Sequence, residues 1–434
     1  MLNLQISIRR LLSSGIFKRT LVYTFSGSFN ALIAFLLLPV LTKYLSPYDY
    51  GVVETFGAVT ACLTGVVIIG GNTLLSKQYF KLGGPEREEY VGNILGMILS
   101  GSLLLFVFFL LFSFFTDFFS NLIKISNALI LLAIAVSFSN AIIALVLTLF
   151  QIEKKTINYA VLANLRTVAD IAVSLFLIVV VGLKWQGRIT GIACGSLLFL
   201  GVALLVFQSN NIKVAFPRRY GKEILLLGVP LIIAHMTGWV NEMIDKLMIS
   251  NLIGVESTGI YSVGYRFGMV IMMVGTAFSR AWLPFFFENI KEHKHAADLK
   301  IVKATYIYIV GLVVVSLCFG LLGKHLLYFM VDKEFYAAGQ FIFLVAMAYC
   351  FDGIWKMFTG YLIYREKTKI YSFIVLFSAI VNVVLNYILL QKIGLIGAAW
   401  ATFVSFGVGA ILTVYAGARV HPMPWRLGFL KTIS

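Results

Sequence analysis

The sequence predicts an all-α polytopic membrane protein, and its composition, its long apolar runs and their lack of alternation support this fold class. Apolar residues make up 60% of the 434 residues and charged residues only 12%, whereas soluble domains have about 45–50% apolar and about 25% charged residues. Stretches such as LLLFVFFLLFSFF (103–115) are apolar on every side. Strands of a membrane barrel would alternate apolar and polar residues. The spanning elements are therefore predicted to be helices.

Twelve apolar stretches are long enough to cross a bilayer as helices, which takes about 17–25 residues. In chain order they are 17–41, 51–75, 91–115, 125–150, 158–182, 189–208, 224–249, 258–282, 304–322, 337–362, 371–390 and 394–416. The residues before the first stretch include Arg9 and Arg10 without a signal-peptide pattern, so we expect an uncleaved interfacial helix. The longest loop is the charged stretch from Phe285 to Lys303, and the longest on the opposite side is Gly323 to Tyr336.

An internal repeat divides the chain into two halves. LSPYDYG (45–51) matches IGVESTG (253–259), and both end in glycine. Two further pairs keep the same register: KTINY (155–159) with KTKIY (367–371), and GRITGIACGSL (187–197) with GLIGAAWATFV (394–404). Six spans per half give both halves the same orientation, with a site expected between them. We therefore expect an N-terminal lobe at 1–212, with helices 1–6 after the interfacial helix, and a C-terminal lobe at 213–434, with helices 7–12, around a central cavity.

The net charge of +16 is explained by the distribution of basic residues over the loops rather than by nucleic-acid binding. Of the 35 lysines and arginines, 24 fall on one side of the predicted spans, seven on the other and four within spans. Cytoplasmic loops carry the excess of lysine and arginine in membrane proteins. Both termini of this multi-pass membrane protein are therefore predicted to be cytoplasmic.

Charged residues inside the predicted spans are the strongest indication of function. A charge at the centre of a bilayer costs about 2.5–3.5 kcal/mol on insertion scales, so such residues often mark substrate or ion pathways. The stretch from His235 to Phe267 contains four of them. Opposite charges also recur four residues apart, on one helix face, in three pairs: Arg166 with Asp170, Glu242 with Lys246, and Asp352 with Lys356. Mutual neutralisation that fixes helix against helix is the alternative interpretation.

Arg266 has no acidic partner within its own predicted helix. A guanidinium that faces the interior suits a phosphate or carboxylate, which it binds through paired hydrogen bonds. A salt bridge to Glu256 or Asp245 across the hairpin is the alternative. His235 is interpreted as a packing residue in preference to a proton relay. Asparagines within spans either line a polar cavity or bond helix to helix, and the sequence leaves both interpretations open.

The sequence predicts that the protein is not an enzyme. It contains no P-loop, no HExxH motif and no nucleophile elbow, so neither catalytic residues, nor a metal site, nor a cofactor is expected. ATP hydrolysis by this chain is not expected, and energy for transport would come from gradients or the membrane potential. A membrane glycosyltransferase, ligase or polymerase would need a larger loop than any predicted here.

Three segments give the chain a resemblance to a known family: PVLTKYLSPYDYG (39–51), DKLMISNLIGVESTGIYSVGYRF (245–267) and NVVLNYILLQKIGLIGAAWAT (382–402). The chain resembles the Wzx-type polysaccharide or O-antigen repeat-unit flippases of the multidrug/oligosaccharidyl-lipid/polysaccharide exporter superfamily. The resemblance implies a protein of a bacterial inner membrane that works by alternating access around a cationic cavity. It also implies transfer of undecaprenyl-diphosphate-linked oligosaccharides from the cytoplasmic to the periplasmic leaflet.

The resemblance also implies which residues carry this function. Of the charged residues proposed for the cavity, only Asp245, Lys246 and Arg266 lie within the family's motifs and carry over residue by residue. The expected cationic cavity contains Lys246, Arg266, Arg166 and Lys356, and the carboxylates expected to couple transport to ions or protons are Asp245, Glu242, Asp352 and Asp170. The implied partners are a lipid-linked anionic oligosaccharide, membrane lipids, a polysaccharide polymerase and a chain-length regulator, without nucleic acid.

Two other functions within the superfamily remain as alternatives. A multidrug and toxin extrusion antiporter would need acidic residues without basic neighbours, and nearly every acid within the spans has a base nearby. A lipid II flippase would usually have two more helices. The residues do not specify the sugars of the substrate, the coupling ion or the oligomeric state.

Overall fold

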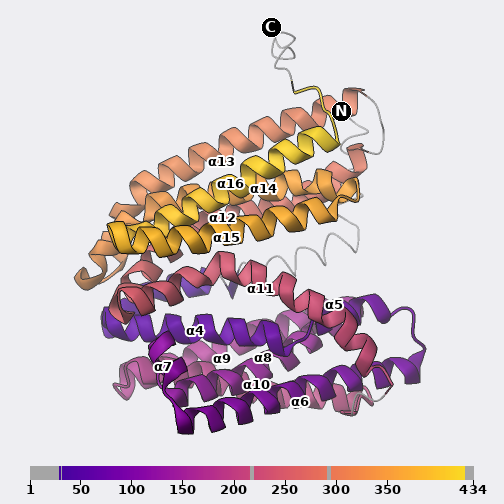
Figure 1. The fold of residues 1–434 in the computed structure, drawn as a ribbon, viewed down its shortest axis with the longest axis vertical. Helices are drawn as coiled ribbons and strands as arrows, with labels where there is room; N and C mark the ends of the chain where they lie inside the picture. Colours follow the sequence, from indigo (N-terminus) through magenta and orange to yellow (C-terminus); the bar gives the residue numbers. More distant parts are fainter. Residues whose placement is uncertain (1–28, 31, 216–218, 291–294, 426–434) are drawn as a thin grey trace. The chain divides into compact units, whose positions relative to one another are not determined.

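The computed structural model describes residues 29–30, 32–215, 219–290 and 295–425, and no strand occurs among them. Helices make up most of this part of the chain (Figure 1). Their bounds are α3 Leu38–Tyr44, α4 Pro47–Val67, α5 Gly71–Gln78, α6 Gly84–Phe115, α7 Phe118–Ile123, α8 Asn127–Ile152, α9 Thr156–Leu175, η1 Phe176–Val180, α10 Trp185–Ser209, α11 Gly221–Leu252, α12 Val255–Ile290, α13 His295–Met330, η2 Lys333–Gln340, α14 Ile342–Tyr364, α15 Thr368–Ile393 and α16 Ile396–Val420. The expected interfacial helix lies outside the described residues.

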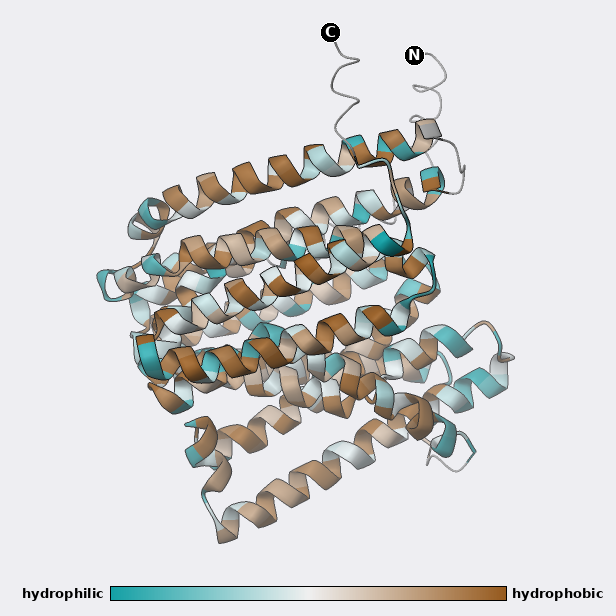
Figure 2. Cartoon of the chain, turned by 45° about the horizontal axis from the view of Figure 1, so that its top comes forward, coloured by the Kyte–Doolittle hydropathy of each residue, from teal (hydrophilic) through white to brown (hydrophobic). Residues whose placement is uncertain are grey.

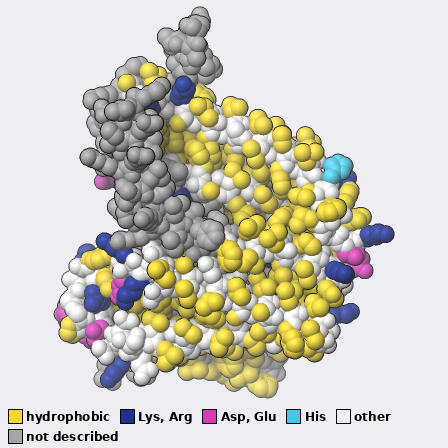
Figure 3. All heavy atoms as spheres, turned by 180° about the vertical axis from the view of Figure 1, so that it is seen from behind, with side chains coloured by type: hydrophobic (Ala, Val, Ile, Leu, Met, Phe, Trp, Pro, Cys, Tyr) yellow, Lys and Arg dark blue, Asp and Glu magenta, His cyan; other side chains and the backbone are white. Residues whose placement is uncertain are grey.

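The predicted fold class is confirmed. In the described part of the chain, 11 helices are long and apolar enough to cross a membrane, and the shorter apolar helix Leu32–Tyr44 covers the described end of the predicted first span. A total of twelve is compatible with this. Figure 2 shows hydrophobic residues along the middle of the helices and hydrophilic residues near many helix ends. Figure 3 shows the surface of one face, which is mostly hydrophobic, with charged side chains towards its edges. The chain is a multi-pass membrane protein.

The predicted loop from Phe285 to Lys303 is wrong. α12 continues to Ile290 and α13 begins at His295, so only 291–294, which are not described, separate the two helices. α13 also continues to Met330, well into the predicted loop Gly323–Tyr336. Lysine, glutamate and alanine are good helix formers, so the helices extend beyond the apolar stretch that identified them.

The predicted second span, 51–75, is interrupted within the apolar stretch. α4 ends at Val67 and α5 starts at Gly71, and between them Ile69 and Gly70 have φ angles of 50° and 65°. Glycine adopts positive φ readily, but for a β-branched isoleucine this is an outlier that the surrounding structure must hold in place. α11 passes closely over the break, because a Cβ on Gly228 would lie 2.5 Å from the carbonyl oxygen of Ile69.

The chain forms two compact units, which are described separately. Unit 1 consists of 1–239 with 254–259, and unit 2 of 240–253 with 260–434. The lobe boundary between 212 and 213 stays a prediction. In unit 1, α9 and α10 approach each other through glycines at every fourth position of α10. A Cβ on Gly191 would lie 2.0 Å from the Ser174 hydroxyl, and one on Gly195 would lie 3.0 Å from the Asp170 Cβ. Small residues at such positions let helix backbones approach.

The two glycines that end the repeated motifs pack reciprocally within unit 1. Gly51 is the fifth residue of α4 and Gly259 the fifth residue of α12. A Cβ on Gly51 would lie 1.8 Å from the carbonyl oxygen of Val255, and one on Gly259 would lie 1.9 Å from that of Pro47. Each glycine thus faces the first residue of the other helix. The α4 end of this contact is fixed by a capping box between Ser46 and Asp49.

Unit 2 is packed mainly through α14, α15 and α16. Close approach again depends on glycine, because a Cβ on Gly409 would lie 2.1 Å from the Trp355 ring. Polar side chains bond α15 to α16: Asn382 Nδ2 donates to Ser405 Oγ at 3.1 Å, and Ser378 Oγ donates to the Ser405 carbonyl at 2.8 Å. For Asn382 the structure therefore decides between the two open interpretations, in favour of helix-to-helix bonding.

Candidate functional site

The first polar cluster of unit 1 connects α9 to α10 through Asp170 and Arg188. Arg188 Nη1 donates to Asp170 Oδ1 at 2.5 Å and to Ser174 Oγ at 2.6 Å. The two charged side chains are only 16% and 22% exposed. The close packing at Gly191 brings Ser174 within reach of this pair. Arg188 was not predicted as a site residue, and the GxxxG spacing of Gly187, Gly191 and Gly195 is the signal that could have indicated a close contact with α9.

The charges of Arg166 and Asp170 interact, as their spacing predicts, but the two side chains are not hydrogen-bonded to each other. Arg166 Nη2 donates to Asn140 Oδ1 on α8 and, at 3.3 Å, to Ser196 Oγ on α10. Asp170 instead accepts a hydrogen bond from Arg188. The long guanidinium side chain of Arg166 instead reaches side chains on two neighbouring helices, α8 and α10. Arg166 is thus a half-buried cation whose hydrogen-bond partners in the described chain are uncharged.

The centre of the polar cluster in unit 2 is Asp245 on α11, which is only 3% exposed. Tyr261 Oη on α12 donates to Asp245 Oδ2 at 2.7 Å, and the backbone N–H of Lys246 donates to Asp245 Oδ1 at 2.8 Å. Lys246 is 5% exposed, and its Nζ lies 5.6 Å from the centre of the Tyr265 ring, within cation–π range. Asp245 and Lys246 are therefore both buried, beside a pair of tyrosines one helical turn apart.

A bond between two tyrosines extends this cluster from α12 to α14. Tyr349 Oη donates to Tyr265 Oη at 2.9 Å, and the two rings meet edge to face. Sequence reasoning missed these tyrosines. The YSVGY spacing (261–265), with two aromatic hydroxyls on one face of a helix, is the signal that could have found them. Buried tyrosine hydroxyls usually require a partner, and here each has one.

The charged face of α14 confirms one of the predicted pairs. Lys356 Nζ donates to Asp352 Oδ2 at 2.5 Å, and the two side chains are 39% and 18% exposed. Glu242 on α11 has an exposed side chain and interacts electrostatically with Asp352, Lys356 and Lys246. The structure therefore groups the charges of α11 and α14 within unit 2. Arg266 lies half-buried on α12, directly after Tyr265.

His235 is not part of the charged cluster of unit 2, because it lies on the part of α11 that belongs to unit 1. A Cβ on Gly65 of α4 would be 2.2 Å from the His235 ring, and Trp239 Nε1 donates to the Ala58 carbonyl at 3.0 Å. This contact fits the interpretation of His235 as a packing residue.

Comparison with known proteins identifies the family. The family described as "Polysaccharide biosynthesis protein" matches residues 16–290 of this chain, more than half of its length. The chain belongs to this family. A second family description, MatE, matches residues 230–388. A protein of the Lsg locus of Haemophilus influenzae is 20% identical over 375 residues, which cover 85% of this chain and 90% of that protein.

Solved structures give the same fold for this polysaccharide biosynthesis family member. The inward closed conformation of the lipid II flippase MurJ is similar with a TM-score of 0.73 and 15% identity, over 91% of this chain and 87% of that one. An inward-facing multidrug resistance MATE transporter of the MOP superfamily has a TM-score of 0.63 and 16% identity, over 96% and 97%. At 15% and 16% identity these two likenesses show that the chain shares the fold of both proteins.

Proposed function

We propose that the protein moves undecaprenyl-diphosphate-linked oligosaccharide repeat units from the cytoplasmic to the periplasmic leaflet of a bacterial inner membrane, with both termini in the cytoplasm. The observation that carries this proposal is the charged cluster within the spanning helices of unit 2, which contains the buried Asp245 and Lys246 and the ion pair of Lys356 with Asp352. A diphosphate sugar head group cannot cross hydrocarbon unaided, because desolvating its charges is too costly. Cations within the protein replace the water, while the polyprenyl tail stays in lipid.

The roles follow from the surroundings of each side chain. Lys246, Arg266 and Lys356 in unit 2, and Arg166 in unit 1, hold the phosphates during alternating access. Arg166 suits this role because its hydrogen bonds go to an amide and a hydroxyl, and the carboxylate that interacts with its charge, Asp170, is hydrogen-bonded to Arg188.

The four carboxylates have unequal surroundings. Asp245, Glu242 and Asp352 stand beside lysines, so their protonation would strengthen the hold of these cations on an anion, and their ionisation would weaken it. Asp170 is the fourth candidate for this coupling, although Arg188 already binds it. If Asp245→Asn and Asp352→Asn both kept full transport with unchanged pH dependence, coupling through these groups would be excluded. ATP hydrolysis by this chain has no part in the proposal.

Complementation of a deletion strain tests the function. We expect deletion to abolish surface polysaccharide and to leave lipid-linked units on the cytoplasmic side. Lys246→Ala and Arg266→Ala should restore less than a tenth of the wild-type polysaccharide at equal protein level, because each removes a cation for the diphosphate. Lys43→Gln, an exposed lysine at the end of α3, is the matched control and should restore it fully. Normal export by both alanine variants would refute the cationic site.

A multidrug antiporter is the second candidate, because the MatE match at 230–388 includes the carboxylates Asp245 and Asp352. Everted membrane vesicles with a cationic dye in the outside medium distinguish the two functions. An antiporter would take the dye up into the vesicles in exchange for protons or sodium ions. Under our proposal, vesicles that contain the protein should take up no more dye than vesicles that lack it. Our proposal also expects no rescue of a strain depleted of its lipid II flippase. Co-purification with a polysaccharide polymerase or a chain-length regulator would test the proposed partners.

A further inference from the structure

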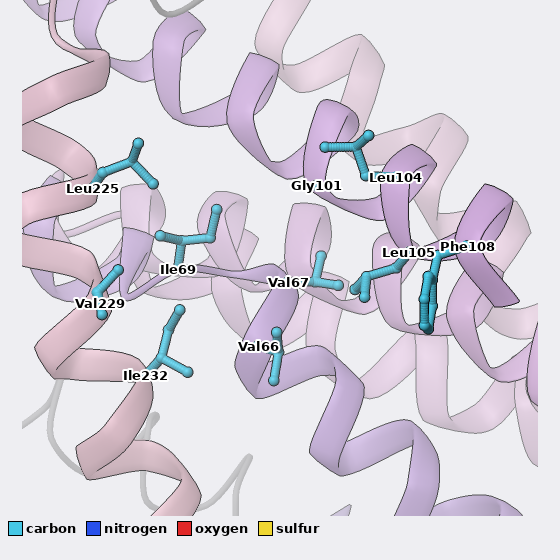
Figure 4. Close-up of a pocket in the computed structure, with 10 residues that line it drawn as sticks. All are labelled: Val66, Val67, Ile69, Gly101, Leu104, Leu105, Phe108, Leu225, Val229 and Ile232. Carbon is cyan, nitrogen blue, oxygen red and sulfur yellow. The ribbon is translucent and has the colours of Figure 1, made fainter. Parts of the chain in front are cut away.

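A cavity of about 390 Å³ lies within unit 1, beside the interrupted second span (Figure 4). Its lining comes from α4 and the break after it, from α6 and from α11: Val66, Val67, Ile69, Gly101, Leu104, Leu105, Phe108, Leu225, Val229 and Ile232. Every lining side chain is apolar. Figure 4 shows these residues extending from α11 on one side, past Ile69 and α4, to Phe108 on α6. An elongated apolar groove on spanning helices suits a hydrocarbon chain.

The groove depends on two features of the backbone. Gly101 contributes no side chain to the wall of α6, and the atom nearest to a Cβ placed there would be Ile69 Cδ1 at 4.0 Å. Ile69 itself has a φ of 50°, an outlier for a β-branched residue that tends to mark functional sites. The strained break thus turns an apolar side chain into the groove opposite the one residue of α6 that leaves it open.

Two lysines flank a hydrogen bond between α5 and α11 that lies close in the chain to Leu225, at one end of the groove lining. Gln78 Nε2, at the end of α5, donates to Glu223 Oε1, near the start of α11, at 2.7 Å. Lys77 and Lys222 are the chain neighbours of this bonded pair, and both side chains are exposed. Lys222 also precedes Leu225 by three residues, so both lie on one face of α11.

The two lysines differ in their ion pairing from the nearby Arg219. Arg219, at the same end, donates to Glu86 and Glu89 at 3.1 and 3.0 Å. Lys77 and Lys222 have no ion-pair partner within the described ranges. Lysine is a compact charge that binds a single phosphate well. The positive end and the apolar groove together match the two parts of an anionic lipid.

We propose that this groove binds one acyl chain of an anionic phospholipid, with the lipid phosphate on Lys77 and Lys222. The occupant is a resident membrane lipid and not the transported one. The cations assigned to the transported head group lie on α9, α12, α14 and the unit 2 part of α11, and none of them lines the groove. The site is therefore independent of the proposed transport function.

Photo-crosslinking of the purified full-length protein tests the proposal. The probe is phosphatidylglycerol with a diazirine on its acyl chain, and peptide mapping locates the label. We expect labelling of the α4, α6 and α11 segments that line the groove. Gly101→Leu should reduce this labelling at least fivefold, because the new side chain fills the groove. Gly201→Leu is the matched control: a Cβ on this exposed glycine of α10 would have no neighbouring atom within 4 Å, and labelling should not change.

The remaining variants keep the test decisive if Gly101→Leu folds poorly. Val229→Phe fills the groove from α11, where Val229 is 47% exposed, and should have the same effect. Lys77→Gln with Lys222→Gln should make labelling by phosphatidylglycerol equal to labelling by phosphatidylcholine, whereas Lys184→Gln should not. Equal loss in Gly101→Leu and Gly201→Leu, or no preference for the anionic lipid in the wild type, would overturn the proposal. Displacement of the probe by geranylgeranyl diphosphate at lower concentrations than by phosphatidylglycerol would also overturn it, in favour of a polyprenyl site.

Discussion

The two units use an ion pair in different ways. In unit 1, Arg188 on α10 and Asp170 on α9 pair across two helices and are 16% and 22% exposed. In unit 2, Lys356 and Asp352 pair within α14 alone, and the lysine is 39% exposed. The first pair holds two helices together, whereas the second neutralises charge on one helix face and can open without separating any helices. Opposite charges in a spanning segment therefore have two functions, and the helices that they join distinguish them.

The largest effect on stability is expected from Asp170→Ala. Breaking a buried pair costs about 3–5 kcal/mol, and the residual exposure of these side chains reduces our expectation to about 2–3 kcal/mol. Arg188 would lose its charged partner and keep only Ser174. Thermal unfolding of the detergent-solubilised protein measures the change, with Asp352→Ala as the control. Equal loss of stability in the two variants would contradict the distinction between the pairs.

Tyr261→Phe is expected to have the next largest effect, because it removes a donor from a buried carboxylate. Hydrogen bonds to charged groups contribute about 1.5–3 kcal/mol, so a loss of about 2 kcal/mol is expected in the same unfolding experiment. Tyr349→Phe removes a bond between two neutral hydroxyls and should cost about 1 kcal/mol. A larger effect at Tyr349 would mean that Asp245 does not depend on Tyr261.

Gly191→Ala tests whether close approach of α9 and α10 positions the pair of unit 1. Its Cβ would lie 2.0 Å from Ser174 Oγ and 2.7 Å from the Ser174 backbone nitrogen, so the helices must separate. Overpacking of this kind costs about 1–3 kcal/mol, and we expect the free energy of unfolding to fall by about 1.5 kcal/mol. Gly201→Ala, on the open face of the same helix, should instead stabilise by up to about 1 kcal/mol through helix propensity. The two substitutions should therefore shift the unfolding temperature in opposite directions.

The smallest change in stability is expected when both members of the unit 2 pair are neutralised. Asp352→Asn with Lys356→Gln should alter the free energy of unfolding by about 0.5 kcal/mol, the usual contribution of a pair four residues apart on one helix. Export should nevertheless fall at least tenfold in the complementation assay, because a cation of the proposed site is lost. Unimpaired export would show that this pair is not required for transport, and the proposed site would then consist of the other cations.

The sequence predicted what depends on local pattern. The helical membrane fold follows from the apolar runs, and the bond between Asp352 and Lys356 follows from their spacing on one helix. The ion pair of Asp170 with Arg188 was not predicted, because Arg188 lies on a different helix, whose approach to α9 is set by glycines. The break at Ile69 was not predicted, because an isoleucine within an apolar run gives no local sign of a helix end. The break is held by a tertiary contact with Gly228 of α11. Long-range geometry, rather than composition, decided each of these differences.

The reciprocal contact of Gly51 and Gly259 has a consequence for sequence variation within the family. Each glycine makes room for a backbone carbonyl of the other helix, so a side chain at either position pushes both helices apart and removes the need for a small residue at the other. Substitutions at the two positions are therefore expected to occur together, although the positions lie in different halves of the chain. Relatives that carry a larger residue at one position are expected to have lost the glycine at the other as well.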